Sequence, residues 1–496
     1  MDQLIIDFIE KGIKNGQIAA IDRIYIMNQL GMISHCTELN GNLVPSTVLL
    51  SQLELLDGII GGMIEKGIID ETLADREISE AQIMNLLTPL PSVVNHEFHR
   101  YYQKSPELAT NYFYRLSQEN NYIKTREIAK NSHFSVPTKY GELEITINLS
   151  KPEKDPKQII LEKSALQSNY PKCLLCMENE GYQGRVNHPA RSNHRIVRLS
   201  LNDERWGLQY SPYAYYSEHC IFLSEEHRPM KIQQATFRKL LAIVKEFPHY
   251  FAGSNADLPI VGGSILAHDH YQGGRHTFAM AQAPIMEHFK LKEFPEISMG
   301  IVKWPMSVIR LSGKDVSELE LAATHVLKKW EDYSDQAVGI LANDEDGTPH
   351  NTITPIARKN GAYFELDLVL RNNSRTDDYP DGIFHPHQDV QHIKKENIGL
   401  IEVMGLAILP PRLKNELQEV EDFLLGKVTK VAEYHQSWAE KLKNKERMIT
   451  PENVHEIVEQ AVGKVFLRVL EDAGVYKQND IGLAAFKKFI MYANQK

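Results

Sequence analysis

The hydrophobic positions of the first 135 residues recur every three or four positions, which is the spacing of amphipathic helices. We expect a first helix that starts at Asp2, whose carboxylate would cap it, and another that starts at Pro45 and Ser46. No arrangement of residues in this part of the chain indicates catalysis. The pattern therefore predicts a mainly helical, structural N-terminal region over residues 1–140.

Beyond residue 135, short runs of alternating apolar and polar residues predict strands. The expected strands lie near residues 143–149, 195–201, 219–224, 307–311 and 363–371. The expected helices lie over residues 231–250, 316–333, 413–445 and 451–472. Residues 151–157 form a polar, proline-bearing connector. Because the order strand, helix, strand occurs twice, the chain is predicted to be an α+β protein with related units at 141–290 and 291–425, followed by C-terminal helices over 426–496.

The composition is that of an ordinary globular protein, with 496 residues, 42% hydrophobic and 24% charged. The formal net charge of −10, from 55 basic and 65 acidic residues, argues against a nucleic-acid-binding surface. No apolar run reaches the roughly 18 residues that span a membrane, and the acidic N-terminus does not resemble a signal peptide. The four cysteines are too few for a disulfide scaffold and predict a reducing cytoplasm.

The most informative segment is residues 257–274, which read DLPIVGGSILAHDHYQGG. The apolar run at 265–267 follows two glycines and predicts a strand, in which His268, His270 and Gln272 would share a face because alternate side chains do. A neutral imidazole can attack phosphorus, and an amide can donate to a phosphoryl oxygen. A pair of histidines two positions apart is common by itself, but glycines on both sides leave room for a ligand.

This segment resembles the signature of the class II galactose-1-phosphate uridylyltransferases, the form found in Gram-positive bacteria. The chain length, the motif Cys173-Leu174-Leu175-Cys176 and residues 402–405 (EVMG) are also similar to that family. The resemblance implies two tandem histidine-triad-like units in each chain. It also implies a homodimer, because the active sites of the family lie near a dimer interface.

The implied reaction converts UDP-glucose and galactose-1-phosphate into glucose-1-phosphate and UDP-galactose. The family places the nucleophile at the second histidine of the pair, which is His270 here, and forms a uridylyl-histidine intermediate. Imidazole suits this role because its pKa lies near 6.5 and much of it is neutral at pH 7. Gln272 would donate to the transferring phosphoryl group. Hydrolytic relatives carry a third histidine at this spacing, so we expect Gln272 to protect the intermediate from water.

The two cysteines at 173 and 176 have the spacing of metal ligands. By themselves they would also fit a redox pair or two incidental thiols. The resemblance supplies His227 and His268 as the remaining ligands of a structural zinc site, which would orient the histidine pair. No organic cofactor is expected.

The residues expected to bind substrate come partly from chemistry and partly from family alignment. They are Arg185, Arg191, Gln209, Asn255, Gly262, Gly263 and Ser264. The two arginines belong to a cluster, which also includes Arg195, that suits phosphate but also fits a solvated basic loop. The glycines and the serine would offer backbone amides and a hydroxyl to the diphosphate. The glutamine and the asparagine align with nucleotide-contacting residues of class I relatives.

A second histidine motif and two alternative functions are weighed against this interpretation. The motif His385-Pro386-His387-Gln388 resembles the class I active-site sequence H-P-H-G-Q, but it lacks the glycine, so we expect a loop there. A nucleotide phosphorylase or hydrolase of the same superfamily would use similar residues. A non-enzymatic, zinc-stabilised scaffold would use both His268 and His270 as ligands.

Overall fold

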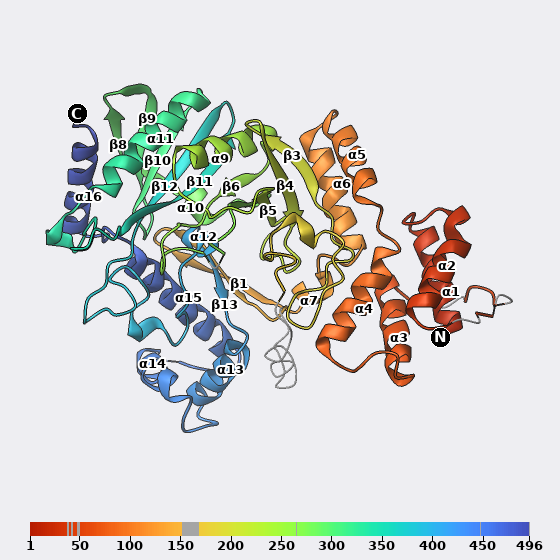
Figure 1. The fold of residues 1–496 in the computed structure, drawn as a ribbon. Coiled ribbons are helices and arrows are strands. Elements are labelled where there is room, and N and C mark those ends of the chain that lie inside the picture. Colours follow the sequence, from red (N-terminus) through yellow and green to blue (C-terminus); the bar gives the residue numbers. More distant parts are fainter. Residues whose placement is uncertain are drawn as a thin grey trace.

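The computed structural model describes residues 1–36, 39–40, 43–46, 50–150, 168–263, 265–446 and 448–495. Helices α1 to α4 lie at one end of the molecule, and α16 with the C-terminus lies at the opposite end (Figure 1). Mixed strands and helices fill the space between them, which confirms the predicted α+β class. Within the described ranges, no helix combines the length and the apolar character needed to cross a membrane. The predicted connector at 151–157 lies outside the described residues.

The N-terminal region is helical, as predicted, up to residue 128. Its elements are α1 (Asp2–Lys14), η1 (Ala20–Asp22), α2 (Arg23–Ile33), α3 (Gln52–Glu65), α4 (Leu73–Asn85), α5 (Pro91–Tyr102), α6 (Pro106–Glu119) and α7 (Thr125–Ile128). The expected start at Pro45 is wrong, because α3 begins at Gln52, where Ser51 and Glu54 form a capping box. Asp2 does not cap α1; its carboxylate accepts hydrogen bonds from Cys36 Sγ and the Asn40 backbone.

A ten-stranded antiparallel sheet forms the centre of the molecule, in the order β3-β4-β5-β7-β6-β11-β12-β10-β9-β8. The strands are β3 (Val197–Leu201), β4 (Glu204–Tyr210), β5 (Cys220–Ser224), β6 (Phe251–Gly253), β7 (His270–Gly274), β8 (Ile285–Leu291), β9 (Phe294–Val302), β10 (Val308–Gly313), β11 (Asn351–Asn360) and β12 (Tyr363–Asn372). The halves meet where Gly253 of β6 pairs with Ile356 of β11.

The two halves of the sheet repeat one topology, which confirms two tandem units. In each half, three strands are followed by a helix and two more strands, and the last strand inserts between the third and the fourth. The helices are α9 (Gln234–Glu246) and α11 (Val316–Glu331). They cover one face of the sheet with the apolar core that contains Trp206, Phe237 and Trp330. Tyr271 of β7 belongs to the same core, so His270 and Gln272 on either side of it point to the opposite face.

The strand predicted near residues 143–149 does not belong to this sheet. It is β2 (Gly141–Ile147), which pairs with β1 (Ser132–Thr138) and, in parallel, with β13 (Leu406–Leu409). A second apolar core joins this small sheet to the C-terminal helices. The remaining elements are η2 (Met177–Asn179), α10 (Ala279–Gln282), η3 (Gln336–Val338), η4 (Gln388–Val390), α12 (Leu400–Val403), α13 (Leu413–Leu424), α14 (Glu433–Lys445), α15 (Val454–Ala473) and α16 (Asp480–Ala493).

Candidate active site and metal centre

Strand β7 carries the second histidine and the glutamine of the motif, but it begins later than predicted. Residues 265–267 are not a strand. The Leu266 carbonyl accepts a hydrogen bond from Met230 N (3.0 Å), and Asp269 N donates to the Arg228 carbonyl (2.7 Å), but these separate hydrogen bonds form no continuous ladder. His268 therefore lies in the irregular segment before β7. Only the two later side chains of the motif share a face by strand alternation.

The imidazole of His270 is buried and has a defined tautomer. Its Nδ1 lies 2.7 Å from the carbonyl oxygen of His268. Because a carbonyl oxygen only accepts, Nδ1 carries the proton and Nε2 keeps its lone pair. Burial lowers the pKa of the ring, so the imidazole is neutral near pH 7. A neutral ring with a free Nε2 can act as a nucleophile.

Gln272 lies on the same face of β7 and is half-buried. Its Oε1 lies 3.1 Å from Nε2 of His219, which precedes the neighbouring strand β5. The NH2 group of Gln272 has no hydrogen-bond partner among the described side chains and backbone, which leaves it available to a ligand. Tyr271, which lies between His270 and Gln272 in the strand, points to the other face and stacks on Trp206 with ring centroids 5.2 Å apart.

The four predicted metal ligands form one cluster, in which all candidate ligand atoms lie within 4.8 Å of one another. Cys173 Sγ lies 3.4 Å from Cys176 Sγ and 3.2 Å from His268 Nδ1, and Cys176 Sγ lies 3.1 Å from His227 Nδ1. Ligand atoms around a tetrahedral zinc ion are separated by about 3.3–3.8 Å, given zinc bonds of about 2.0–2.3 Å. The arrangement therefore fits an ion of this size with little adjustment.

Neighbouring groups orient these ligands. Nε2 of His268 donates to the carbonyl oxygen of Ser224 (2.8 Å), which leaves Nδ1 free to bind a metal. Asn179 donates through Nδ2 to the carbonyl oxygens of Cys173 (2.8 Å) and Cys176 (2.9 Å). His188 in turn contacts Asn179 Oδ1 at 2.7 Å. This support could not be predicted from the sequence, because a single asparagine and a single histidine carry no spacing signal.

Arg185 and Arg191 line one pocket of about 320 Å³, together with Leu174 from between the two cysteines. Arg185 is held inside its loop, since its guanidinium donates to the Tyr170 carbonyl and the Tyr182 hydroxyl. The guanidinium of Arg191 lies 5.5 Å from the centre of the Tyr122 ring, which also lines the pocket. The pocket thus combines cationic and aromatic surfaces.

The structure does not bring the other predicted binding residues into this pocket. Gln209 is buried, and its Oε1 lies 3.0 Å from Nε2 of His194, which stacks on Tyr122 at 4.3 Å. Gln209 therefore reaches the pocket only through another ring. Asn255 uses Oδ1 to accept a hydrogen bond from the Leu400 backbone (2.8 Å), which fixes its carboxamide.

The glycines before the motif are required by close packing. A Cβ on Gly262 would lie 2.5 Å from the Leu258 carbonyl oxygen, and one on Gly263 would lie 2.7 Å from Asn255 Nδ2. This crowding accounts for both glycines without any ligand. Ser264 lies outside the described residues.

Arg195 and the second histidine motif, residues 385–388, make their contacts away from β7. Arg195 donates to the carbonyl oxygens of Thr88 and Pro89, so it anchors the N-terminal helices instead of facing a ligand. His387 contacts the Ile383 carbonyl at 3.1 Å and Asp472 at 3.5 Å. The second histidine motif therefore lies in a loop, as predicted. The contacts of His387 are made within that loop and with α15.

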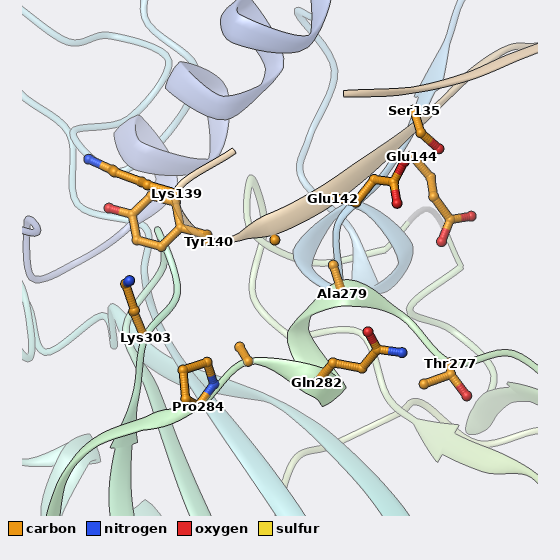
Figure 2. A pocket seen from close by; sticks show the side chains of 12 residues that line it. Ser135, Lys139, Tyr140, Glu142, Glu144, Thr277, Ala279, Gln282, Pro284 and Lys303 are labelled. Carbon is orange, nitrogen blue, oxygen red and sulfur yellow. The ribbon is translucent and has the colours of Figure 1, made fainter. Parts of the chain in front are cut away.

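A further pocket of about 440 Å³ opens between the β1–β2 hairpin and α10 and contains none of the predicted residues. Figure 2 shows Lys139 and Lys303 at one end of it and Glu142 and Glu144 at the other. Glu144 Oε1 lies 3.0 Å from Nε2 of His276, and His276 follows the end of β7 by two residues. The sequence could not indicate this pocket, because its residues come from separate segments.

Comparisons with known proteins identify the family of this chain. The N-terminal domain model of galactose-1-phosphate uridyl transferase matches residues 60–229, and the C-terminal domain model matches residues 243–440. A curated galactose-1-phosphate uridylyltransferase of Ligilactobacillus salivarius is 56% identical over 492 residues, which cover 99% of this chain and 98% of that protein. The chain belongs to the galactose-1-phosphate uridylyltransferase family.

Other members of the family are similarly close. The galactose-1-phosphate uridylyltransferase of Enterococcus faecalis is 54% identical, with 97% of each chain covered, and that of Streptococcus thermophilus is 54% identical, with 99% of each covered. Among solved structures, yeast Ap4A phosphorylase Apa2 aligns with a TM-score of 0.37 and 10% identity, over 67% of this chain and 95% of that one.

Proposed function

We propose that this chain transfers a uridylyl group from UDP-glucose to galactose-1-phosphate, through a covalent intermediate on His270. Family membership supports the overall reaction. The observation that carries the mechanism is the hydrogen bond from His270 Nδ1 to the His268 carbonyl, which leaves Nε2 unprotonated and nucleophilic.

The reaction needs two displacements at one phosphorus atom. In the first, the Nε2 lone pair attacks the α-phosphorus of UDP-glucose, and the bond to the bridging oxygen breaks, so glucose-1-phosphate leaves with the electron pair. In the second, a phosphate oxygen of galactose-1-phosphate attacks the same phosphorus, and the electron pair of the P–N bond returns to Nε2. Throughout, the proton stays on Nδ1 of His270 and is donated in a hydrogen bond to the His268 carbonyl oxygen, which stabilises the positive charge that develops on the ring.

Gln272 would donate its NH2 group to a non-bridging oxygen of the transferring phosphoryl group. A carboxamide cannot accept a proton from water at neutral pH, so it gives no general base for hydrolysis. This property favours a transferase over the hydrolase alternative. Product analysis with inorganic phosphate or galactose-1-phosphate as acceptor distinguishes the transferase from a phosphorylase.

The direct test replaces His270 with alanine. We expect transfer between UDP-glucose and galactose-1-phosphate to fall by at least about 1,000-fold, while the melting temperature stays close to that of the wild type. The same experiment tests the scaffold alternative, in which His270 is a metal ligand. A variant that unfolds or loses its metal would support the scaffold, and a variant that retains full transfer would overturn the proposed nucleophile.

We also propose that Cys173, Cys176, His227 and His268 hold one zinc ion with a structural role. Protein atoms fill all four positions, so the ion would leave no site for substrate. When bound, it would fix His268, whose carbonyl oxygen in turn holds the His270 ring.

Metal analysis of the purified protein tests this proposal. We expect about one zinc ion per chain in the wild type and nearly none after Cys176→Ala, with a lower melting temperature in that variant, because a structural site contributes folding free energy. Cys220→Ala is the matched control, since that buried free thiol lies outside the cluster. Equal zinc content in wild type and Cys176→Ala would contradict the assignment.

The nucleotide would occupy the pocket lined by Arg185 and Arg191. The Tyr122 ring in this pocket suits a base, and the two guanidinium groups suit the phosphates. Gln209 would act indirectly, through His194. Asn255 would act through the loop before β7, since it packs against Gly263 there. The backbone amides of that loop remain the proposed donors to the diphosphate. We further propose a cytoplasmic homodimer that binds UDP-hexoses and hexose-1-phosphates.

A further inference from the structure

His219 lies next to Gln272 because of the way strands β5 and β7 pair. Ile221 of β5 is directly opposite Gln272, so continuing the register places His219 opposite Gly274. No side chain can stand at Gly274, where a Cβ would lie 2.8 Å from the Tyr216 ring. The imidazole of His219 therefore points toward Gln272, the next residue of β7 on the same face, and its Nε2 lies 3.1 Å from Gln272 Oε1.

The ring of His219 packs against two tyrosine rings. The Tyr216 ring lies 4.5 Å and the Tyr215 ring 5.7 Å from its centre, each tilted by about 30°. The Tyr216 hydroxyl donates to the Gly273 carbonyl oxygen (3.2 Å), which fixes that ring against β7. His219 is only 5% exposed, so its imidazole cannot rotate freely.

The protonation of His219 follows from its surroundings. Burial lowers the pKa of the ring to about 4, so the imidazole is neutral at pH 7 and has a single N–H. Nε2 faces the oxygen of the carboxamide, while Nδ1 is buried without a partner. Because an unpaired acceptor costs less than an unpaired buried donor, the proton belongs on Nε2, where it donates to Gln272 Oε1.

We propose that His219 is a positioning residue that fixes the carboxamide of Gln272, so that its NH2 group and not its oxygen faces the phosphoryl group on His270. The inference rests on the proposed function and adds a residue to it. Without this hydrogen bond the carboxamide can rotate, and its oxygen then repels the phosphoryl oxygens. His219 itself touches neither the substrate nor the reacting atoms.

The test compares two variants of similar size, His219→Gln, which keeps an N–H donor, and His219→Met, which has none. We expect His219→Met to lower kcat by about 10- to 100-fold with a nearly unchanged KM for UDP-glucose. The glutamine variant should recover most of the rate. In the Gln272→Ala background, His219→Met should cause no further loss, because the residue acts through that carboxamide.

His249 provides a matched control on another part of the fold. Burial also lowers its pKa to about 4, its Nε2 contacts Thr110 at 2.9 Å, and its Nδ1 is buried without a partner. His249→Met should therefore disturb folding as much as His219→Met does, but leave kcat unchanged. Melting temperatures of both variants separate loss of stability from loss of rate.

Two results would overturn the inference. One is an equal loss of kcat from His219→Met in the presence and absence of Gln272; the other is wild-type kcat in His219→Met. Should the methionine variant not fold, His219→Leu, which also has no N–H donor, is compared in the same two backgrounds. Failure of the proposed function is a different outcome, since the wild type would then show no transfer, or His270→Ala would retain it.

Discussion

The two ring nitrogens of His270 have different surroundings, and this difference sets the direction of its chemistry. Nδ1 is bound to the carbonyl oxygen of a neighbouring residue that also belongs to the metal cluster, while Nε2 has no protein partner among the described residues. Burial keeps the ring neutral. Under the proposed mechanism, the structural ion and the nucleophile are therefore linked by a single backbone carbonyl of His268.

Gln272→His tests the proposed protection of the intermediate at the residue scale. A histidine at this position could accept a proton from water, so we expect hydrolysis of UDP-glucose without acceptor to rise by at least about 10-fold, and transfer to fall. The released UMP can be measured directly. Gln272→Ala is the control, because it removes the amide without adding a base. Unchanged transfer with no rise in hydrolysis would count against a protective role.

At the scale of elements, strong periodicity predicted the helices and strands that pack against the core. Helix α11 and strands β10 and β12 lie within a few residues of their expected positions. The strand expected at residues 265–267 is absent, because an apolar run needs a partner to become a strand, and this one has only separate backbone hydrogen bonds. His219 could not be predicted as a partner of Gln272, since only the register of β5 against β7 joins them.

The packing of the C-terminal helices predicts a dependence of stability on pH. His435 of α14 lies with its ring centre 5.3 Å from that of His392. Burial, with a smaller contribution from His435, lowers the pKa of His392 to about 4, and burial lowers that of His435. In the unfolded chain both would titrate near 6.5. The unfolded state therefore binds protons first as the pH falls, which destabilises the fold between about pH 6.5 and 4.

Denaturant titrations at several pH values measure this effect. We expect the free energy of unfolding to decrease from pH 7 to pH 5, and the decrease to be smaller in His392→Phe than in the wild type. The difference between the two proteins isolates the histidine from the carboxylates, which titrate in both. Parallel pH profiles for the two would show that His392 does not contribute.

At the scale of the whole molecule, the two halves of the sheet share a topology but differ in chemistry. Strand β12 is the counterpart of β7, and its face away from α11 carries Glu365 and Asp367 in place of the histidine and glutamine. Asp367 forms ion pairs of 2.7 Å with both Arg310 and Arg358. The buried carboxylate of Asp367 is thus paired with two guanidinium groups, which suits a structural role, so we expect one nucleophile in each chain.

The topology shows why a sequence without visible internal repeats forms two similar units. Only the apolar face against α9 and α11 is shared, and many residue combinations satisfy it. The opposite faces differ, because β7 carries His270 and Gln272 there, whereas β12 carries Glu365 and Asp367. The predicted unit boundaries at 141–290 and 291–425 remain predictions, and the repeated sheet itself runs from β3 to β12.

The covalent mechanism is tested by measuring the mass of the intact protein after incubation with UDP-glucose alone, followed by peptide mapping. We expect one UMP per chain, attached to His270, with His385 and His387 unmodified, and the loss of this UMP when galactose-1-phosphate is added. The His270→Ala protein should gain no mass. Transfer without any UMP adduct, or an adduct that persists in the His270→Ala protein, would contradict this mechanism.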